Sequence, residues 1–345
     1  MKHFIYAAAA IIVYAILFGG SALFWQDKFQ ASLLPKLGLG ETKPGLGNDT
    51  NAITLLFAGD IMLDRGVGFY ARQHNDWKWP FLLVANTIQK ADLAFGNLES
   101  VISDKGQNLG SIYSFRADSR AMEGLVFAGF DVLSVANNHS LDYGMDALRD
   151  SMNRLKEAGI IPIGAGETEA EAYGLTTLEV KGTKIGFLGY TNLGSPLWKA
   201  GKGPGVAWVD QYTIEDFQNT IREAKQKSDI LIVSVHFGEE YQTQPSEIQK
   251  LIAESATDAG ADIVIGHHPH VVQLIEPEGS SEPERPVEQY KNGWIAYSLG
   301  NFVFDQGFSK ETMEGLLLEV TVKDKKITKV SPRVIHINSL FQPEL

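Results

Sequence analysis

The sequence predicts an α/β fold whose sheets mix parallel and antiparallel strands. Short apolar runs, typical of buried strands, alternate along the chain with amphipathic segments of helical period. Two further pairs of apolar runs are joined by turn residues, at 181–182 and at 324–326, which is typical of hairpins. Alternating strands and helices favour parallel pairing, and the hairpins add antiparallel strands.

Each expected strand is an apolar-rich run bounded by polar or turn residues. In chain order these runs are 53–58, 93–95, 131–136, 175–180, 183–190, 229–235, 261–265, 294–304 and a pair within 316–337. β-branched residues are frequent in them, as expected for residues that pack on a pleated surface.

The expected helices carry start or stop signals. Pro80 fits a first helical turn, and Gly129, Gly159 and Gly260 each follow a helical segment as a C-terminal stop. The expected helices are 80–89, 119–127, 145–158, 213–227 and 246–259.

Composition restricts the class of protein. The 345 residues are 44% hydrophobic and 21% charged, which is typical of a folded chain with a large core. The formal net charge of −12 argues against a nucleic-acid-binding surface, which would be basic. The absence of cysteine excludes disulfides, thiolate metal sites, a thiol nucleophile and a lipoprotein anchor.

The N-terminal region predicts a membrane anchor. Residues 4–25 carry no charge and match the roughly 20 residues that cross a bilayer as a helix. The run exceeds the apolar core of about 7–15 residues in a cleaved signal peptide, so residues 1–25 are expected to stay as an anchor. A Gly- and Pro-rich linker, 26–51, would join it to a domain at 52–345. Lysines on both sides of the apolar run leave the orientation open.

Polar side chains follow five of the expected strands: Asp60; Asn97 with Glu99; Asn137, Asn138 and His139; His236; and His268 with His270. Each alone is explained equally well as a cap, a turn residue or a core histidine. Together they are the carboxylate, amide and imidazole ligands of one or two divalent cations. Because α/β folds build sites at strand ends, the sequence favours one shared metal site.

Six motifs in fixed order carry a family resemblance: FAGDIMLDR, GNLES, ANNHSLDYG, VHFGEEY, GHHPHVVQ and YSLGNFVFDQ. They resemble the CapA family of capsule or poly-γ-glutamate synthesis proteins, whose domain is similar to calcineurin-like metallophosphoesterases. The resemblance covers roughly residues 53–309. It implies a four-layer αββα sandwich, with two mixed sheets face to face and helices outside.

The resemblance also implies roles for single residues. His139 would protonate the leaving oxygen, and Asp142 would orient His139, although Asp142 could instead cap the following helix. The implied ligands, with Mn²⁺ or Zn²⁺ expected, are Asp60 and His270 for a first ion, Asn138, His236 and His268 for a second, and Glu99 between them.

Three positions depart from the phosphoesterase pattern. Met62 stands where the first motif has a histidine, and a thioether binds these ions weakly. Glu99 replaces an aspartate, and Ser140 stands where an acidic residue is usual. Asp64 is a candidate replacement ligand. A metal-dependent hydrolase is therefore a hypothesis, and the sequence leaves open whether the centre is catalytic.

Five residues are candidates for substrate binding. Arg116 could bind a carboxylate or phosphate through its planar guanidinium, although a surface ion pair explains it equally well. Glu239, Glu240 and Tyr241 follow His236 and could line the cleft, although solvated acidic side chains are the simpler explanation of the two glutamates. Asn301 lies in the SLGNF segment.

The resemblance implies a membrane-anchored component of capsule or poly-γ-glutamate synthesis and export, with its large domain outside the cytoplasm. It would work beside the membrane-bound ligase and export subunits on an anionic polymer, and nucleic acid is not an expected partner. Two alternatives stay open: a surface metal-dependent phosphoesterase with another substrate, and a non-catalytic scaffold.

Overall fold

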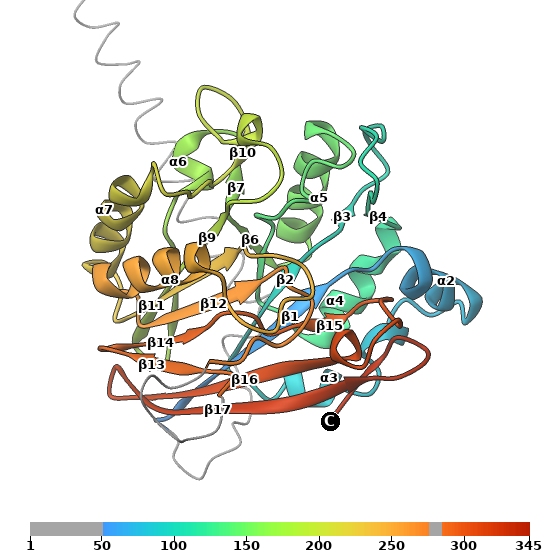
Figure 1. Cartoon of the computed structure of the whole chain (residues 1–345). Helices are drawn as coiled ribbons and strands as arrows, with labels where there is room; N and C mark the ends of the chain where they lie inside the picture. The colour runs from blue at the N-terminus through green and yellow to red at the C-terminus, as the bar shows by residue number, and fades with distance from the viewer. Residues whose placement is uncertain (1–50, 276–284) are drawn as a thin grey trace, which may run out of the picture. The chain divides into compact units, whose positions relative to one another are not determined.

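The computed structural model describes residues 51–275 and 285–345, all of which belong to one compact unit (Figure 1). The predicted anchor, and all of the predicted linker except Asn51, lie outside these residues. In the described part of the chain, no helix combines the length and the apolar character needed to span a membrane.

Two large sheets form the centre of this unit. The first has eight strands in the order β18-β17-β16-β1-β2-β5-β6, with β15 also paired to β1. Its strands are β1 (Ile53–Ile61), β2 (Leu93–Leu98), β5 (Val132–Ser134), β6 (Ile161–Ile163), β15 (Asn301–Val303), β16 (Glu314–Lys323), β17 (Lys326–Ile337) and β18 (Pro343–Glu344).

The second sheet has six strands in the order β13-β14-β12-β11-β9-β8. Its strands are β8 (Thr176–Val180), β9 (Thr183–Thr191), β11 (Ile230–His236), β12 (Ile263–His267), β13 (Glu288–Tyr290) and β14 (Gly293–Ala296). Two small pairs, β3 (Val101–Ile102) with β4 (Arg116–Ala117) and β7 (Ala165–Gly166) with β10 (Gly205–Val206), lie apart from the large sheets.

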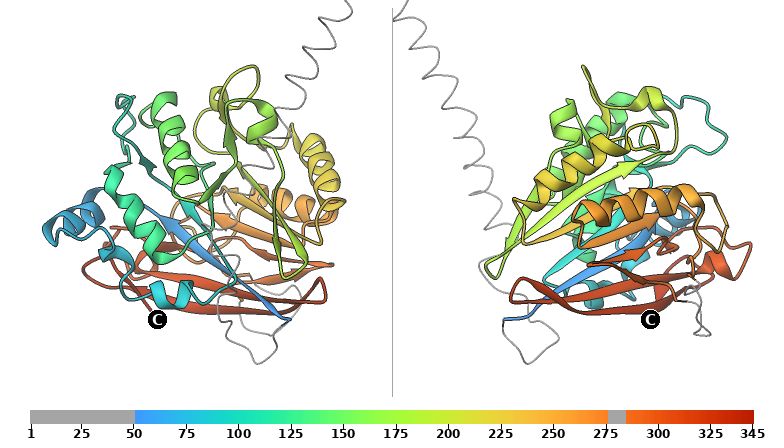
Figure 2. Two further views of the ribbon diagram at one scale, coloured as in Figure 1. Left: turned by 180° about the vertical axis from the view of Figure 1, so that it is seen from behind. Right: turned by 60° about the vertical axis from the view of Figure 1, so that its left-hand side comes forward.

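The helices are α2 (Arg65–Gln73), α3 (Ala85–Ile88), α4 (Met122–Ala128), α5 (Met145–Glu157), α6 (Glu169–Ala172), α7 (Ile214–Lys225) and α8 (Glu247–Ala259). Residues of α4 and α5 pack in one apolar cluster with the first sheet, and residues of α7 and α8 pack in another with the second sheet. Helices therefore cover the outer face of each sheet (Figure 2).

The inner faces of the two sheets share a third apolar cluster. Phe57 and Phe95 from the first sheet meet Phe187 from the second, and the rings of Phe95 and Phe187 stack with centroids 5.9 Å apart. On β1, Leu56 points the other way into the helical cluster. Both faces are buried, which explains why these strands read as nearly continuous apolar runs.

The mixed α/β prediction is confirmed, because each large sheet contains both parallel and antiparallel pairs. The helix expected at 246–259 is α8, which starts with a capping box at Ser246 and ends at left-handed Gly260. Both expected hairpins form, and positive φ values at Lys181 and Gly182 fit a two-residue turn.

Two element predictions are wrong. Residues 80–89 do not form one helix but a 3-10 turn, Trp79–Phe81, followed by the single helical turn α3. Turn residues 82–84 separate the two pieces.

Residues 294–304 do not form one strand. The chain leaves the second sheet after β14 and enters the first sheet as β15. Gly300 permits this crossing because its φ is +67°. Helix α2 was not among the expected elements.

Candidate metal centre

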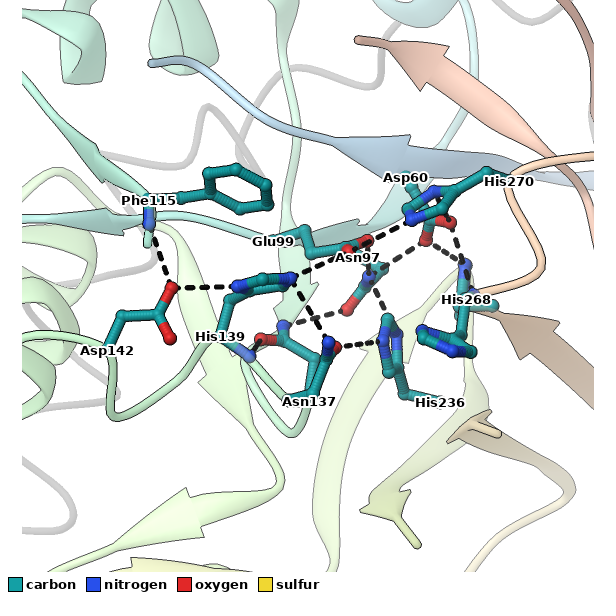
Figure 3. Close-up of polar contacts among 12 residues, drawn as sticks. Asp60, Asn97, Glu99, Phe115, Asn137, His139, Asp142, His236, His268 and His270 are labelled. Carbon is teal, nitrogen blue, oxygen red and sulfur yellow. Dashed lines mark hydrogen bonds and ion pairs between the residues drawn. The ribbon is translucent and has the colours of Figure 1, made fainter. Parts of the chain in front are cut away.

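The candidate site lies where the carboxyl ends of β1, β2, β11 and β12 meet (Figure 3). β1 runs parallel to β2, and β11 runs parallel to β12, so each sheet brings two strand ends to the site. Asp60, Glu99 and His236 come from these strand ends or the residue just beyond them, while loops supply Asn138, His139, His268 and His270. Parallel pairing therefore explains the convergence that the sequence predicted.

Asp60 is fully buried and surrounded by donors. Its Oδ1 accepts a hydrogen bond from Asn97 Nδ2 at 2.9 Å, and its Oδ2 accepts one from the backbone N–H of His268 at 3.2 Å. Burial alone would raise the pKa of Asp60, but hydrogen bonds and charge from His267 and His270 outweigh it and hold the pKa well below its usual value. Asp60 is therefore an anion in the core of the protein.

Glu99 has the opposite electrostatic character. Burial, followed by the charges of Asp60 and Glu240, raises its pKa well above the usual value. Its Oε1 is buried without a hydrogen bond and lies 3.6 Å from His270 Nε2 and 3.8 Å from His139 Nε2. A buried carboxylate oxygen without a donor is costly, and a cation would offset that cost.

His236 and His268 are held as neutral imidazoles. Burial, and then the neighbouring histidines, lower the pKa of both, and that of His268 falls to about 3. Their rings lie 4.9 Å apart, and the buried Nδ1 of His268 has no hydrogen bond. Neutral imidazole is the form that binds a metal, so these side chains are ready to ligate at neutral pH.

The loop after β12 has an unusual backbone. His268 and His270 have φ values of 99° and 60°, in the left-handed region that is uncommon for residues other than glycine. Asp60 holds the His268 N–H, and Tyr241 N–H donates to the Pro269 carbonyl at 2.8 Å. These contacts hold a bent segment in which both imidazoles face the carboxylates (Figure 3).

Two groups of side chains have the spacing needed to hold a metal ion. One is Glu99, His268 and His270, and the other is Asp60, Glu99 and His236; within each group the ligand atoms lie within 4.8 Å of one another. Glu99 belongs to both, and Asp60 Oδ2 also lies 3.4 Å from His270 Nδ1. Asn138 Oδ1, 2.7 Å from His236 Nε2, supplies a further oxygen at the same place. The donor set therefore fits one or two divalent cations.

His139 and Asp142 form a pair at one side of this cluster. The carboxylate Oδ2 of Asp142 lies 2.7 Å from His139 Nδ1 and also accepts the Phe115 N–H at 2.8 Å. The Phe115 ring packs on the imidazole with centroids 4.1 Å apart. His139 Nε2 is consequently turned toward Glu99 (Figure 3).

Met62 and Asp64 lie outside the ligand groups. Met62 is fully buried in the apolar cluster, and its sulfur accepts the Asp64 N–H at 3.1 Å. Asp64 Oδ2 in turn accepts the backbone N–H of Arg116 at 2.9 Å. The Asp64 carboxylate therefore binds the backbone of Arg116 and is not placed as a replacement ligand.

A pocket of about 230 Å³ opens beside His139 and His270. Its other lining residues are Arg65, Tyr113, Phe115, Glu240, Tyr241, Asp305, Gln306 and Phe308. Aromatic rings make up much of the wall, and the charged groups are few. The pocket is thus the route by which a substrate group would approach the buried cluster.

Of the five predicted substrate-binding residues, Glu240 and Tyr241 line this pocket. The Arg116 guanidinium lies over the Tyr143 ring at 4.2 Å and donates to the Lys105 carbonyl at 3.4 Å. Glu239 is exposed and does not line the pocket.

Asn301 is fully buried behind His270. Its Oδ1 lies 3.0 Å from His270 Nδ1, and its Nδ2 donates to Gln306 and to the Thr312 carbonyl, both at 3.0 Å. Asn301 therefore lies outside the pocket lining and is placed to orient an imidazole.

Asn97, which the sequence placed at the shared site without a role of its own, lies at the centre of the cluster. Its Nδ2 is within 3.3 Å of Asp60, Glu99 and His236. The structure adds His267, which the sequence did not single out. His267 is fully buried, and its Nδ1 lies 3.2 Å from Asp60 Oδ1. It stands inside the motif GHHPHVVQ, so the motif marked the segment but not this side chain.

Comparisons with known proteins agree with the motif pattern. The family model described as "Bacterial capsule synthesis protein PGA_cap" matches residues 54–306. The chain is 31% identical over 305 residues to the PGA biosynthesis protein CapA of Bacillus subtilis, covering 87% of this chain and 76% of that protein. It is 31% identical over 283 residues to the capsule biosynthesis protein CapA of Bacillus anthracis, covering 80% of this chain.

The chain spans 65% of the length of the Bacillus anthracis protein. A Mycobacterium tuberculosis protein named as a probable polyglutamine synthesis accessory protein is 28% identical over 330 residues, with 81% of this chain and 82% of that protein covered.

Proposed function

The chain belongs to the PGA_cap family of bacterial capsule synthesis proteins, and on that premise we propose that it serves capsule or poly-γ-glutamate synthesis through a metal centre that acts on an anionic polymer. The observation that carries the metal proposal is the pair of ligand groups that share Glu99, whose Oε1 is buried without a hydrogen bond. The names of two relatives, which refer to capsule and PGA biosynthesis, support an anionic polymer as the substrate.

The residues that would hold the metal are Asp60, Glu99, Asn138, His236, His268 and His270. Their oxygen and imidazole ligands suit Mn²⁺ or Zn²⁺, in one or two copies. When bound, such ions supply positive charge that stabilises the negative charge of a hydrolytic transition state.

In this proposal the chain's own residues attract the cation, donate a proton and orient the proton donor. Asp60 provides negative charge that attracts the cation, Glu99 would give up its proton to become a ligand, and neutral His236 and His268 add ligands without further charge. His139 Nε2 faces the cluster from the pocket side, where it can give a proton to a leaving oxygen or nitrogen. Asp142 accepts a hydrogen bond from His139 Nδ1, so Nε2, which also lies 3.1 Å from Asn138 Nδ2, can donate a proton only from the doubly protonated ring.

Location and partners form part of the same proposal. We place the protein at the cell membrane, with residues 1–25 as a single-pass anchor and the described domain outside the cytoplasm. There it would work with the polymer ligase and export subunits. The uncharged run of residues 4–25 supports the anchor. Protease treatment of intact spheroplasts tests the orientation, and a domain that is protected until the membrane is broken would reverse it.

The function is tested on the purified full-length chain in detergent. Metal analysis should find a divalent ion, and the metal-loaded protein should shorten poly-γ-glutamate while EDTA-treated protein should not. Hydrolysis of a simple phosphodiester but not of the polymer would favour a phosphoesterase with another substrate. Bound metal with no hydrolysis of either compound would favour a scaffold.

A further inference from the structure

One arginine stands in the pocket beside the metal centre without an assigned role. Arg65 is the first residue of α2 and follows β1 by only four positions. Its φ of 45° turns the chain sharply after the strand. Arg65 therefore lines the pocket, whereas Arg116 lies outside it against Tyr143.

The Arg65 guanidinium is held rigidly. Its Nε lies 3.1 Å and 3.2 Å from the two carboxylate oxygens of Asp305, and its Nη2 also contacts that carboxylate. Asp305 is fixed in turn by the Gly66 N–H at 2.9 Å. A guanidinium that is already oriented loses little conformational entropy when it binds a ligand.

Two aromatic rings connect this guanidinium to the histidines at the metal centre. The Arg65 Cζ lies 4.8 Å from the Phe115 centroid and 5.8 Å from the Phe304 centroid. Phe115 packs on His139 at 4.1 Å, and Phe304 packs on His270 at 4.7 Å. The cation therefore stands one ring away from each of the two histidines that line the pocket.

Part of the guanidinium is free to bind. The Arg65 side chain is 35% exposed, and within residues 51–275 and 285–345 its Nη1 makes no hydrogen bond. The pocket otherwise offers aromatic rings, the Gln306 amide, the imidazoles of His139 and His270, and the acidic groups of Glu240 and Asp305. Arg65 is thus the permanent cation of this lining, and a planar N–H donor suits a carboxylate or phosphate oxygen.

We propose that Arg65 forms an anion subsite of the pocket, which binds a carboxylate or phosphate group of the substrate while a neighbouring part of the substrate lies at the metal centre. The subsite is for one anionic group of a larger molecule, because Asp305 offsets part of the positive charge and so weakens binding of a free anion. As a substrate site it rests on the proposed function, but anion binding by Arg65 can be measured without turnover.

The test measures binding of two probes, inorganic phosphate and a γ-linked glutamate trimer, by calorimetry with the full-length chain. Arg65→Gln should weaken binding of the preferred probe by about 10- to 100-fold, the effect expected for one charge-assisted hydrogen-bonded pair. Arg116→Gln removes the same charge outside the pocket and should change affinity by less than about twofold. Arg65→Lys, which keeps the charge but loses the planar fork, should give an intermediate loss.

Each titration is made on Mn²⁺-loaded and on EDTA-treated protein, and thermal unfolding checks that every variant is folded. If Arg65→Gln does not fold, the test uses Arg65→Lys instead, and its loss of probe affinity is compared with that of Arg116→Gln. Equal losses in the Arg65 and Arg116 variants, or no binding of either probe by the original chain, would overturn the subsite. Arg65-dependent binding by protein that takes up no Mn²⁺ when the ion is added would support the subsite and contradict the metal proposal. Preference for the trimer indicates a polycarboxylate substrate, and preference for phosphate indicates a phosphoester.

Discussion

The imidazole of His139 is fixed by Asp142, whose Oδ2 lies 2.7 Å from the imidazole Nδ1. The carboxylate is 1% exposed and also accepts the backbone N–H of Phe115, so it cannot easily move away from the ring. The other imidazole nitrogen is consequently directed at Glu99, 3.8 Å away, in the space between the pocket and the ligand cluster. The pair therefore lies between the pocket and the two candidate ligand groups.

His139→Ala should lower hydrolysis by about 10²–10⁴-fold, because a positioned general acid contributes a factor of that size. Metal content should stay unchanged, since His139 belongs to neither ligand group. Rates are measured with poly-γ-glutamate and with a chromogenic phosphodiester. His336→Ala is the control, because His336 is an exposed histidine on β17. A His139 variant that keeps full activity would remove the general-acid role.

Glu99→Gln should lower the affinity for every bound ion, because Glu99 is common to both ligand groups. The loss should exceed the roughly 10–100-fold that is typical of residues behind the ligands. Metal content after dialysis and the shift in melting temperature on adding Mn²⁺ or Zn²⁺ provide the measurement. Glu240→Gln removes a nearby carboxylate that belongs to neither group, and it should leave stoichiometry unchanged. Normal metal content in Glu99→Gln would show that the cluster does not bind through this residue.

Asn301→Ala should weaken metal binding by about 10–100-fold, because Asn301 orients His270 rather than a substrate. Asn301→Asp keeps an oxygen acceptor for His270 Nδ1 and should retain more affinity than Asn301→Ala. Calorimetric titration with Mn²⁺ compares the two variants. If both variants bind metal normally but lose affinity for the glutamate trimer, Asn301 is a substrate residue after all.

The metal-free protein should lose stability as the pH falls below about 6.5. His236 and His268 have lowered pKa values in the folded protein, that of His268 being about 3. Below about pH 6.5 these histidines therefore bind protons in the unfolded chain but not in the folded chain, and protonation favours unfolding. Each such histidine contributes a slope of about 1.4 kcal/mol per pH unit. Glu99 has the opposite effect on the pH dependence of stability. Because its pKa is raised, the folded chain holds a proton above pH 4.5 that the unfolded chain releases, so the contribution of Glu99 to stability falls as the pH rises.

Urea unfolding of EDTA-treated protein at pH 5, 6 and 7 isolates the His268 contribution. The free energy of unfolding of His268→Gln should depend less on pH than that of the original chain, whatever the absolute cost of the substitution. Parallel pH profiles for the two proteins would mean that His268 is protonated as easily in the folded chain as in the unfolded one.

Met62→Leu should leave metal affinity unchanged and cost less than about 1.5 kcal/mol, because Met62 packs in the apolar cluster and its sulfur accepts the backbone N–H of Asp64. Met62→His, by contrast, adds an imidazole and should raise the affinity of the ion beside Asp60, at some expense of packing. Metal titration and urea unfolding measure both effects. A clear loss of metal in Met62→Leu would identify the thioether as a ligand.

Much of the architecture could be predicted from local sequence. Ser246 with Gln249, and Gly260 after the helix, mark the ends of α8 because capping is an interaction between near neighbours. Lys181 and Gly182 mark a hairpin for the same reason. The break of 294–304 into β14 and β15 could not be predicted, because both halves are apolar and only the tertiary structure decides which sheet each half joins.

The residue types of the centre could be read from the chain, because Asp60, Glu99, Asn138, His236 and the histidine loop follow strands that end at one edge. How neighbouring side chains are used could be seen in the folded protein alone. Arg116 lies against Tyr143, whereas Arg65 lines the pocket. Strand pairing and side-chain alternation follow from local periodicity. The direction of a loop side chain depends on partners such as Asp305, which stands 240 residues away in the chain.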